Sequence, residues 1–442
     1  MDVFFDTHIH LMTLEEPDFA AFLSPLVTSP VSFFSGGLTK DYIPLARQRT
    51  ANDIENTLVT FTQTIVDTMT MMEDDLRGLY RSPSNRASYP DLPYIRDGMI
   101  HFRNRTYGTL VLCPLVMDFT HPEDDGGRTY YPLTCRDKLT PYLEKTLDAI
   151  ASFARLRPAS PIRFMPFSGI SPHAHSQAFL EDYLSRWLDL THRPDGSKPF
   201  FGVKLYPPLG CDPWPSDQSE LKKMRTLYSF CSRHRIPIIT HCDDQGFRGI
   251  DARLAWKYTD PASWRTVLEN YPDLVIDFAH VGRQYGLLNA GGNILDSLAA
   301  KLKGQPTDEW FYSLMGLIQD FDNVYSDISF TGAYRDFYVT LGNYMKSLDD
   351  GRREKLQDRL MFGSDFSINL LRVESYSAWW RIVETSVLSD DLVHRMVSVN
   401  PARFLGLEAD ALCDDASTPR RRLPVFRRSA SGIRSDSSHT SS

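Results

Sequence analysis

The stretch VFFDTHIH, residues 3–10, is the starting point for interpreting this chain. A strand sends successive side chains to opposite faces, so His8 and His10 are expected on one face and Phe5 on the other. Two imidazoles on one face converge, and neutral imidazole nitrogen is a common ligand for zinc and related ions. The stretch therefore predicts part of a metal site, although a half-exposed edge strand would also explain the pattern.

The composition is that of an ordinary globular protein, with 442 residues, 42% of them hydrophobic and 24% charged. A net charge of -8 argues against nucleic acid as the main partner. No apolar run approaches the length of a membrane span, and the N-terminus lacks the pattern of a signal peptide. The six cysteines show no CxxC spacing, which argues against a disulfide framework or a thiolate zinc site. We therefore expect a cytoplasmic protein that acts on a small molecule, with no membrane partner.

From residue 109 onward, short apolar runs alternate with longer amphipathic stretches, a pattern typical of βα units. The expected strands are 110–117, 162–167, 200–206, 236–242, 275–281, 324–328 and 359–365. The expected helices are 141–156, 177–190, 220–234, 261–271, 308–321 and 335–348. With the opening strand this makes about eight βα units, which predicts a (β/α)8 TIM barrel. An open doubly wound sheet is the rival, but the first strand leads into no Gly-rich phosphate turn.

The barrel is expected to comprise residues 1–19 and 107–408, interrupted by an insertion at 20–106. The insertion carries a helical pattern over 52–79, with apolar residues three and four apart. We predict a largely helical insertion that covers the barrel mouth and helps to form the substrate pocket. The tail, 409–442, is rich in Arg and Ser and poor in hydrophobic residues, so disorder is expected there.

Catalytic groups of such a barrel lie at the C-terminal ends of the strands. Four further residues with metal-binding or proton-transfer chemistry fall at or near predicted strand ends. Alternation is expected to send each of them inward with the residue two positions before it: Gly202 with Lys204, Ile239 with His241, Phe278 with His280, and Gly363 with Asp365.

The order of these residues resembles that of the amidohydrolase superfamily of metal-dependent hydrolases. That family has His-x-His on the first strand, Lys on the fourth, His on the fifth and sixth, and Asp on the eighth. The resemblance spans roughly residues 1–407 without the insertion. Residues 400–407 also look like the closing helix of the branch that includes the amino-carboxymuconate semialdehyde decarboxylase type. The resemblance implies a divalent metal, most often zinc with manganese as an alternative, and a homodimer is possible.

The resemblance leaves the number of metal ions open. If Lys204 is carboxylated, its carbamate would bridge two ions, one held by Asp365 with the two first-strand histidines and the other held by His241 and His280. If Lys204 stays an amine, one ion would be held by Asp365, His241 and the two first-strand histidines, with His280 as a proton carrier. A third interpretation makes Lys204 a structural lysine that donates to loop carbonyls.

The reaction that the resemblance implies is hydrolysis of an amide, lactone or other ester by a metal-activated water, with Asp365 relaying the proton. One alternative is a nonhydrolytic decarboxylase of an aromatic or unsaturated carboxylic acid, in which His280 or Asp365 handles the proton. Another is a noncatalytic metal-binding barrel that serves as an interaction module. The retained proton carriers count against that last alternative.

Three more residues are candidates for substrate contact. Asp118 follows the second strand, Tyr206 lies one alternation beyond Lys204, and Arg283 could bind a carboxylate through its planar fork. Asp118 and Arg283 could equally brace loops. The nearby pair His173 and His175 is interpreted as part of a solvated loop because turn residues surround it.

Overall fold

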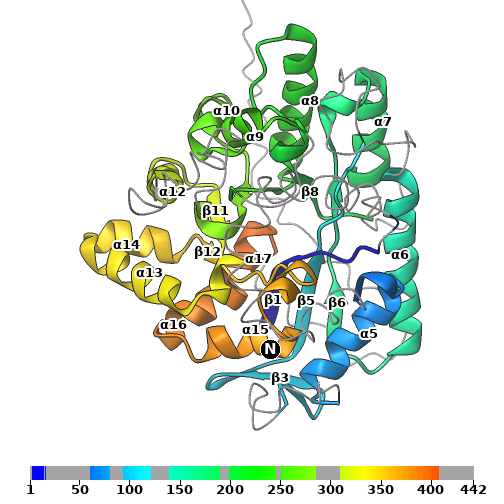
Figure 1. The fold of residues 1–442 in the computed structure, drawn as a ribbon, viewed down its shortest axis with the longest axis vertical. Coiled ribbons are helices and arrows are strands. Elements are labelled where there is room, and N and C mark those ends of the chain that lie inside the picture. Colours follow the sequence, from blue (N-terminus) through cyan, green and yellow to red (C-terminus); the bar gives the residue numbers. More distant parts are fainter. Residues whose placement is uncertain are drawn as a thin grey trace, which may run out of the picture.

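The computed structural model describes residues 2–13, 15, 60–79, 93–120, 139–189, 199–244, 250–284 and 309–407. The predicted disordered tail and much of the predicted insertion lie outside these residues. Figure 1 shows strands at the centre and helices around them. Among the described residues, no helix combines the length and the apolar character that a bilayer span requires.

Two parallel sheets make up the centre of the molecule, and every strand pair within them is parallel. The first holds β1 (Val3–Ile9), β5 (Thr109–Pro114) and β6 (Ile162–Phe164). The second holds β7 (Phe167–Gly169), β8 (Gly202–Leu205), β9 (Ile238–Thr240), β10 (Ile276–Phe278), β11 (Val324–Asp327) and β12 (Leu360–Met361). Bridges between Leu115 and Phe167 and between Ile9 and Phe366 join the sheets at both edges. With β6 and β7 counted as one interrupted strand, this is the predicted (β/α)8 barrel, and the fold prediction is confirmed.

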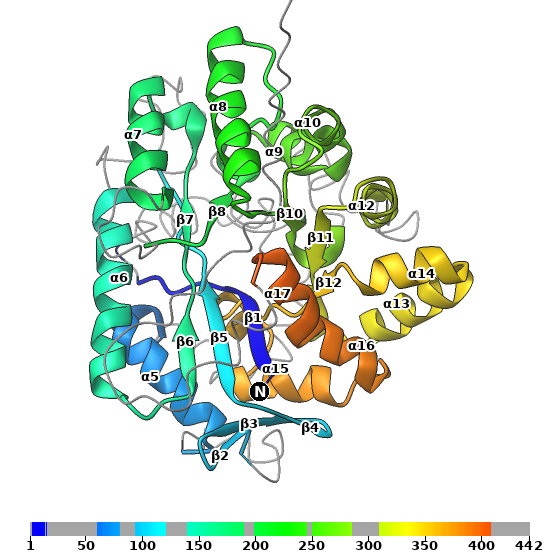
Figure 2. The same ribbon diagram turned by 180° about the vertical axis from the view of Figure 1, so that it is seen from behind.

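Helices cover the outside of this barrel (Figures 1 and 2). They are α6 (Leu139–Leu156), α7 (Gln177–Leu188), α8 (Gln218–His234), α9 (Ala252–Thr259), α10 (Arg265–Asn270), α12 (Glu309–Asp320), α13 (Arg335–Ser347), α14 (Asp350–Gln357), α15 (Tyr376–Glu384), α16 (Asp390–His394) and α17 (Asn400–Phe404). Their starts follow local chemistry. Asp217, for example, accepts hydrogen bonds from the first backbone N–H groups of α8, and Ser176 does the same for α7.

Side chains from the strands divide into an interior and an outer layer. Val3, Phe5, Ile239 and Met361 belong to the cluster that fills the barrel, together with Tyr325. The outer faces pack against the helices in a larger cluster. Because both faces of the sheet are apolar, the strands read as nearly continuous apolar runs, as buried parallel strands do.

The described parts of the predicted insertion do not lie at the barrel mouth. The helix α5 (Ile65–Leu76) falls within the predicted helical stretch and packs on α6 and α15 at the outer wall. A small antiparallel sheet, β2 (Ile95–Arg96), β3 (Met99–Phe102) and β4 (Arg105–Tyr107), follows it. This sheet lies beside the start of β1, where the rings of Phe102 and Phe4 are 5.2 Å apart (Figure 2). Residues 95–106 of the predicted insertion thus form strands in addition to its helix, and coverage of the mouth stays a prediction for the residues outside the described ranges.

Candidate metal centre

Four imidazole rings form a row at the C-terminal end of the barrel. The ring centroids of His10 and His8 are 5.1 Å apart, those of His8 and His280 are 5.0 Å apart, and those of His280 and His241 are 4.8 Å apart. All four residues are buried. Residues that are more than 270 positions apart in the sequence thus meet at one place because the barrel brings the ends of β1, β9 and β10 together.

The first-strand histidines face each other through ring nitrogens that carry no proton. His8 Nδ1 donates to Asp327 Oδ2 over 2.8 Å, and His10 Nδ1 donates to the Leu115 carbonyl over 3.1 Å. A carbonyl or carboxylate only accepts, so each Nδ1 holds the proton and each Nε2 keeps its lone pair. The two Nε2 atoms lie 3.2 Å apart, and Asp365 Oδ1 lies 3.4 Å from each of them. Two lone pairs and a carboxylate oxygen at these distances repel one another unless a proton or a metal ion lies among them.

A second group of the same kind lies next to the first. His280 Nδ1 donates to the Ser329 carbonyl over 3.0 Å, and His241 Nε2 donates to Asp243 Oδ1 over 2.9 Å. The remaining lone pairs, on His280 Nε2 and His241 Nδ1, face each other at 3.1 Å. Asp243 is a residue that the sequence interpretation missed, although it lies only two positions after His241.

The distances within both groups fit a divalent metal. Two nitrogens that bind one tetrahedral ion with bonds of about 2.0–2.1 Å lie roughly 3.3 Å apart. The facing nitrogens are separated by 3.2 Å in the first group and 3.1 Å in the second. The described residues also form three overlapping clusters able to hold an ion: His8 with His10 and Asp365, His241 with Asp243 and His280, and His8 with His280 and Asp327.

Asp327 and Ser329 form a hub beneath the imidazoles that the sequence interpretation also missed. Asp327 Oδ1 accepts from the backbone N–H of His280 over 3.2 Å and from that of Ser329 over 2.9 Å, while Oδ2 accepts from His8. Ser329 Oγ lies 2.9 Å from His280 Nδ1. One carboxylate thus fixes the ring of one histidine and the backbone of another. Asp327 lies one residue before the end of the predicted strand 324–328, near a strand end like the other site residues, and this was the signal that could have found it.

Backbone geometry turns two site residues inward. Phe278 packs outward with its ring 5.7 Å from that of Trp264, so the prediction that Phe278 shares a face with His280 is wrong. His280 has φ 67° and Val281 has φ 58°, and this left-handed backbone redirects the His280 ring. Likewise, Phe5 lies in the barrel interior, because a register shift between Asp6 and Ile9 interrupts the alternation of β1 before His8.

Glycine is required at two places beside the site. A Cβ on Gly363 would lie 2.8 Å from His8 Cβ and 3.2 Å from Asp327 Cγ. A Cβ on Gly202 would lie 2.1 Å from the interior ring of Phe167. Both glycines therefore face inward, as alternation with Asp365 and Lys204 predicts.

Lys204 lies buried in the same region, with its Nζ 5.9 Å from the centroid of the Tyr206 ring. Its Nζ and both carboxylate oxygens of Asp277 have no hydrogen-bond partner among the described residues. Donation from Lys204 to loop carbonyls, the third interpretation, is therefore not seen. Burial lowers the pKa of Lys204 to about 8, against the opposing charges of Asp327 and Asp365. An amine in this position is one that can lose its proton near neutral pH.

Burial also sets the ionisation of the imidazoles and of Asp365. It lowers the pKa of His8 to about 3 and that of His280 to about 4, so both rings are neutral, which is the form that binds metals. Burial raises the pKa of Asp365 well above its usual range. Burial alone would raise the pKa of Asp327 too, but the hydrogen bond that it accepts from His8 holds it below the ordinary value.

The three predicted substrate residues have different surroundings. The Tyr206 ring packs on His241 with centroids 4.5 Å apart, and the Arg283 guanidinium lies over the Tyr334 ring. Asp118 accepts from Ser171 N over 2.8 Å and pairs with His175 Nε2 at 2.8 Å, so the structure shows it bracing loops. The His175 side chain is 7% exposed, and its interpretation as a solvated residue is therefore wrong.

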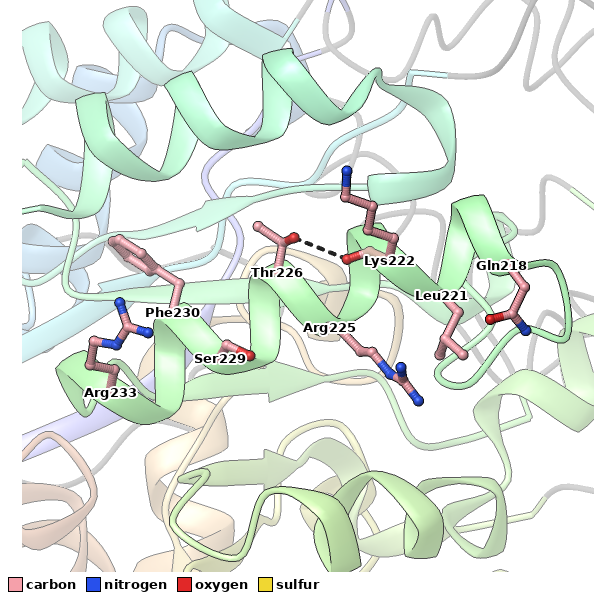
Figure 3. Close-up of a pocket in the computed structure, with 8 residues that line it drawn as sticks. All are labelled: Gln218, Leu221, Lys222, Arg225, Thr226, Ser229, Phe230 and Arg233. Carbon is pink, nitrogen blue, oxygen red and sulfur yellow. Dashed lines mark hydrogen bonds between the residues drawn. The ribbon is translucent and has the colours of Figure 1, made fainter.

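A hollow of about 520 Å³ lies elsewhere, along α8 (Figure 3). It is lined by Gln218, Leu221, Lys222, Arg225, Thr226, Ser229, Phe230 and Arg233. All eight residues belong to one helix at the outside of the barrel, and none is a metal-type residue of the barrel mouth. This hollow is therefore not the candidate catalytic site.

Comparison with known proteins gives one family match and several similar folds. The family model described as Amidohydrolase matches residues 146–407. No curated protein matches the chain. A 5-carboxyvanillate decarboxylase from Novosphingobium aromaticivorans, solved with bound manganese, is 12% identical, with a TM-score of 0.49 over 92% of this chain and 97% of that one. A probable 2-pyrone-4,6-dicarboxylic acid hydrolase from Acinetobacter baumannii is 11% identical, with a TM-score of 0.44 over 92% and 100%. Nothing about the reaction of this chain follows from similarity at this level.

Proposed function

This chain belongs to the amidohydrolase family of metal-dependent enzymes, and from its site we propose that it hydrolyses an amide, lactone or other ester bond of a small molecule. The observation that carries the proposal is the position of Asp365. Its Oδ1 lies 3.4 Å from both unprotonated first-strand nitrogens, which supports a role for this carboxylate in accepting a proton from an activated water.

The residues present fit two divalent ions, because two separate pairs of imidazole lone pairs face each other. His8, His10 and Asp365 would hold the first, and His241 and His280, with Asp243 beside them, the second. We propose zinc, with manganese as the alternative. A divalent ion bound there supplies Lewis acidity and lowers the pKa of water. Lys204 is the residue to link the two groups, and its carboxylation by carbon dioxide would turn the amine into an anionic bridging ligand.

The protein's own residues then supply positioning and proton transfer. Asp365 accepts a proton from water and passes it to the leaving group. Asp327 keeps the His8 ring in the tautomer whose Nε2 faces the site, and the Leu115 carbonyl does the same for His10. Tyr206 packs on His241 and restricts its ring.

Elemental analysis of the purified full-length protein tests the metal part of this proposal. We expect close to two ions per chain in the wild type and a loss of metal in His8→Ala and Asp365→Ala. His234→Ala serves as the matched control, since this histidine is exposed on α8. A wild type that binds no metal after reconstitution would contradict the proposal.

Decarboxylation is the second candidate reaction, and Arg283 favours it. Arg283 follows His280 by three positions in the sequence, and its planar guanidinium is suited to binding a substrate carboxylate. A panel of lactones, amides, aryl esters and aromatic carboxylic acids, incubated with the metal-loaded enzyme in ¹⁸O-labelled water, separates the two reactions. Hydrolysis places the label in the product, whereas decarboxylation releases carbon dioxide from an unlabelled acid. A noncatalytic barrel would turn over nothing in the panel.

A further inference from the structure

A buried carboxylate, Asp6, joins the first strand of the barrel to the chain that follows the last strand. Its Oδ1 accepts from the backbone N–H of His8 over 3.2 Å and from that of Ser364 over 2.9 Å. Asp6 lies two positions before His8 in β1, and its side chain is buried. Ser364 directly precedes Asp365 in the sequence. One carboxylate oxygen therefore holds the backbone beside two of the proposed metal ligands.

The backbone of Asp365 requires such support. Its φ is 62°, a left-handed value that is uncommon for a residue other than glycine and persists where surrounding contacts hold it. The N–H groups of Asp365 and Ser364 both donate to the His8 carbonyl, over 2.7 and 3.2 Å. Together with the hydrogen bond from Ser364 to Asp6, they set where the Asp365 carboxylate lies relative to His8 Nε2, which is 3.4 Å from it.

The other oxygen of Asp6 is held by a tyrosine from a distant part of the chain. Tyr376 donates through its hydroxyl to Asp6 Oδ2 over 2.8 Å, and both side chains are buried. The Tyr376 ring packs against those of Phe366 and Trp380, with centroids 5.2 and 5.8 Å away. A fixed donor on Oδ2 orients the carboxylate so that Oδ1 faces the two backbone N–H groups.

The start of α15 fixes the place of Tyr376, which is the first residue of this helix. Ser375 caps the helix by accepting from the N–H of Ala378 over 3.1 Å. On the other side, Ser377 donates from its backbone N and its hydroxyl to the two oxygens of Asp75, over 2.6 and 2.9 Å. Asp75 belongs to α5, within the predicted insertion. Hydrogen bonds and one helix start thus connect this part of the insertion to the metal centre.

We propose that Asp6 and Tyr376 are positioning residues of the metal centre. Asp6 holds the backbones of His8 and Asp365 at the separation that one ion requires, and Tyr376 acts through Asp6. The proposal rests on the proposed function, because it takes these two residues and His10 as ligands of one ion. Asp6 is not a member of the three ligand clusters of the described residues, so its replacement would affect an ion through the positions of other side chains.

The test uses Co²⁺ as the probe and the full-length protein. The ligand-field absorption of Co²⁺ depends on the number and geometry of its ligands, and competition with a chelator gives the affinity. The variants are Asp6→Ala, Asp6→Asn, Tyr376→Phe and the double variant Asp6→Ala/Tyr376→Phe. The matched control is Tyr94→Phe, because Tyr94 is also buried and donates over 2.8 Å to the carboxylate of Glu384, at the other end of α15. Circular dichroism and thermal unfolding establish which variants are folded.

Asp6→Ala leaves two backbone N–H groups without their acceptor, so the Co²⁺ affinity should fall by about 10-fold or more and the ligand-field spectrum should change. Asp6→Asn keeps one oxygen for both N–H groups and should bind Co²⁺ within about three-fold of the wild type. Tyr376→Phe should lower the affinity by about three-fold or more when Asp6 is present and have no further effect beside Asp6→Ala. Tyr94→Phe should lower only the thermal stability.

An unchanged affinity and spectrum in folded Asp6→Ala would overturn the proposal, because lower thermal stability alone would show a purely structural role. An equal effect of Tyr376→Phe with and without Asp6 would also overturn it, since Tyr376 would then not act through Asp6. If Asp6→Ala does not fold, Tyr376→Phe decides, and an affinity equal to that of Tyr94→Phe overturns the proposal. A wild type that binds no Co²⁺ would refute the metal centre itself and this proposal with it, so the two failures are distinguishable.

Discussion

Replacing Asp327 with Asn should change the tautomer of His8 and thereby weaken metal binding. The Asp327 carboxylate accepts four hydrogen bonds, from His8 Nδ1, from the backbone N–H groups of His280 and Ser329, and from the Ser329 hydroxyl. An amide has only one oxygen, and the two backbone donors require it. The amide NH₂ would then face His8 Nδ1, which must become an acceptor, and the proton moves to Nε2. That proton occupies the lone pair that faces His10 and Asp365.

Loss of an outer hydrogen-bond partner of this kind typically lowers metal affinity by about 10- to 100-fold, or roughly 1.4–2.7 kcal/mol. Competition with a chelating indicator measures the affinity, and nitrogen NMR of ¹⁵N-labelled histidine reports the tautomer. The matched control is Asp322→Asn, because the Asp322 side chain is 84% exposed and pairs with Lys355 at the surface. This substitution should change neither the metal affinity nor the tautomer of His8. If Asp327→Asn bound metal as tightly as the wild type, with His8 still protonated at Nδ1, the assignment of Asp327 as a positioning residue would be refuted.

Three further changes test the site and its surroundings. Gly363→Ala places a Cβ 2.8 Å from His8 Cβ, so urea unfolding should show a loss of stability of about 1–3 kcal/mol. Gly342→Ala is the control, because a Cβ on this glycine of α13 meets open space, and it should stabilise the protein by about 0.5–1 kcal/mol. Equal effects of the two substitutions would argue against the close approach of Gly363 to His8. Metal at 100 times its Kd should stabilise the wild type by about 2.7 kcal/mol and should stabilise Asp365→Ala far less, as thermal unfolding would show. Burial raises the pKa of Asp75 to about 6 from an ordinary 3.8, so the folded state holds a proton that the unfolded state loses, and the stability of the wild type falls as pH rises from about 4 to 6. Asp75→Asn has no carboxyl group to titrate, so its free energy of unfolding relative to that of the wild type should rise by about 2 kcal/mol between pH 4 and 7. A difference in urea unfolding that does not depend on pH would contradict the raised pKa of Asp75.

The sequence was sufficient for the barrel and for the residues at its strand ends. Strands that are buried on both faces appear in the sequence as short apolar runs, and eight such runs that alternate with helices are compatible with few folds. His8, His10, His241, His280 and Asp365 come together as strand-end positions require. Local periodicity predicts the direction of a side chain correctly wherever the backbone of the strand is regular.

The errors occur where the backbone is irregular or where a role depends on distant partners. A register shift in β1 overturned the assignment of Phe5 to the face opposite the histidines, and left-handed residues after β10 overturned the inward assignment of Phe278. Asp327 acts through His8, a residue 319 positions away, so its role appears only when the barrel closes. Asp118 looked equally suited to substrate contact, yet its oxygens are used by a loop amide and by His175.

The polar groups of this barrel are concentrated at one end, and the other end supplies the stability that this requires. Facing lone pairs, the buried Lys204 amine and the Asp277 carboxylate each cost free energy, about 1–3 kcal/mol for an unsatisfied group. Below them, Val3, Phe5 and Ile239 form part of an apolar interior, and the rings of Phe4 and Trp380 stack at 4.3 Å on its outer side. Cations bound among the imidazoles would remove the repulsion between the lone pairs without changing that core. Packing of that core and the hydrogen bonds to Asp327, Leu115 and Ser329 therefore fix the positions of the imidazoles, which preorganises them for a cation.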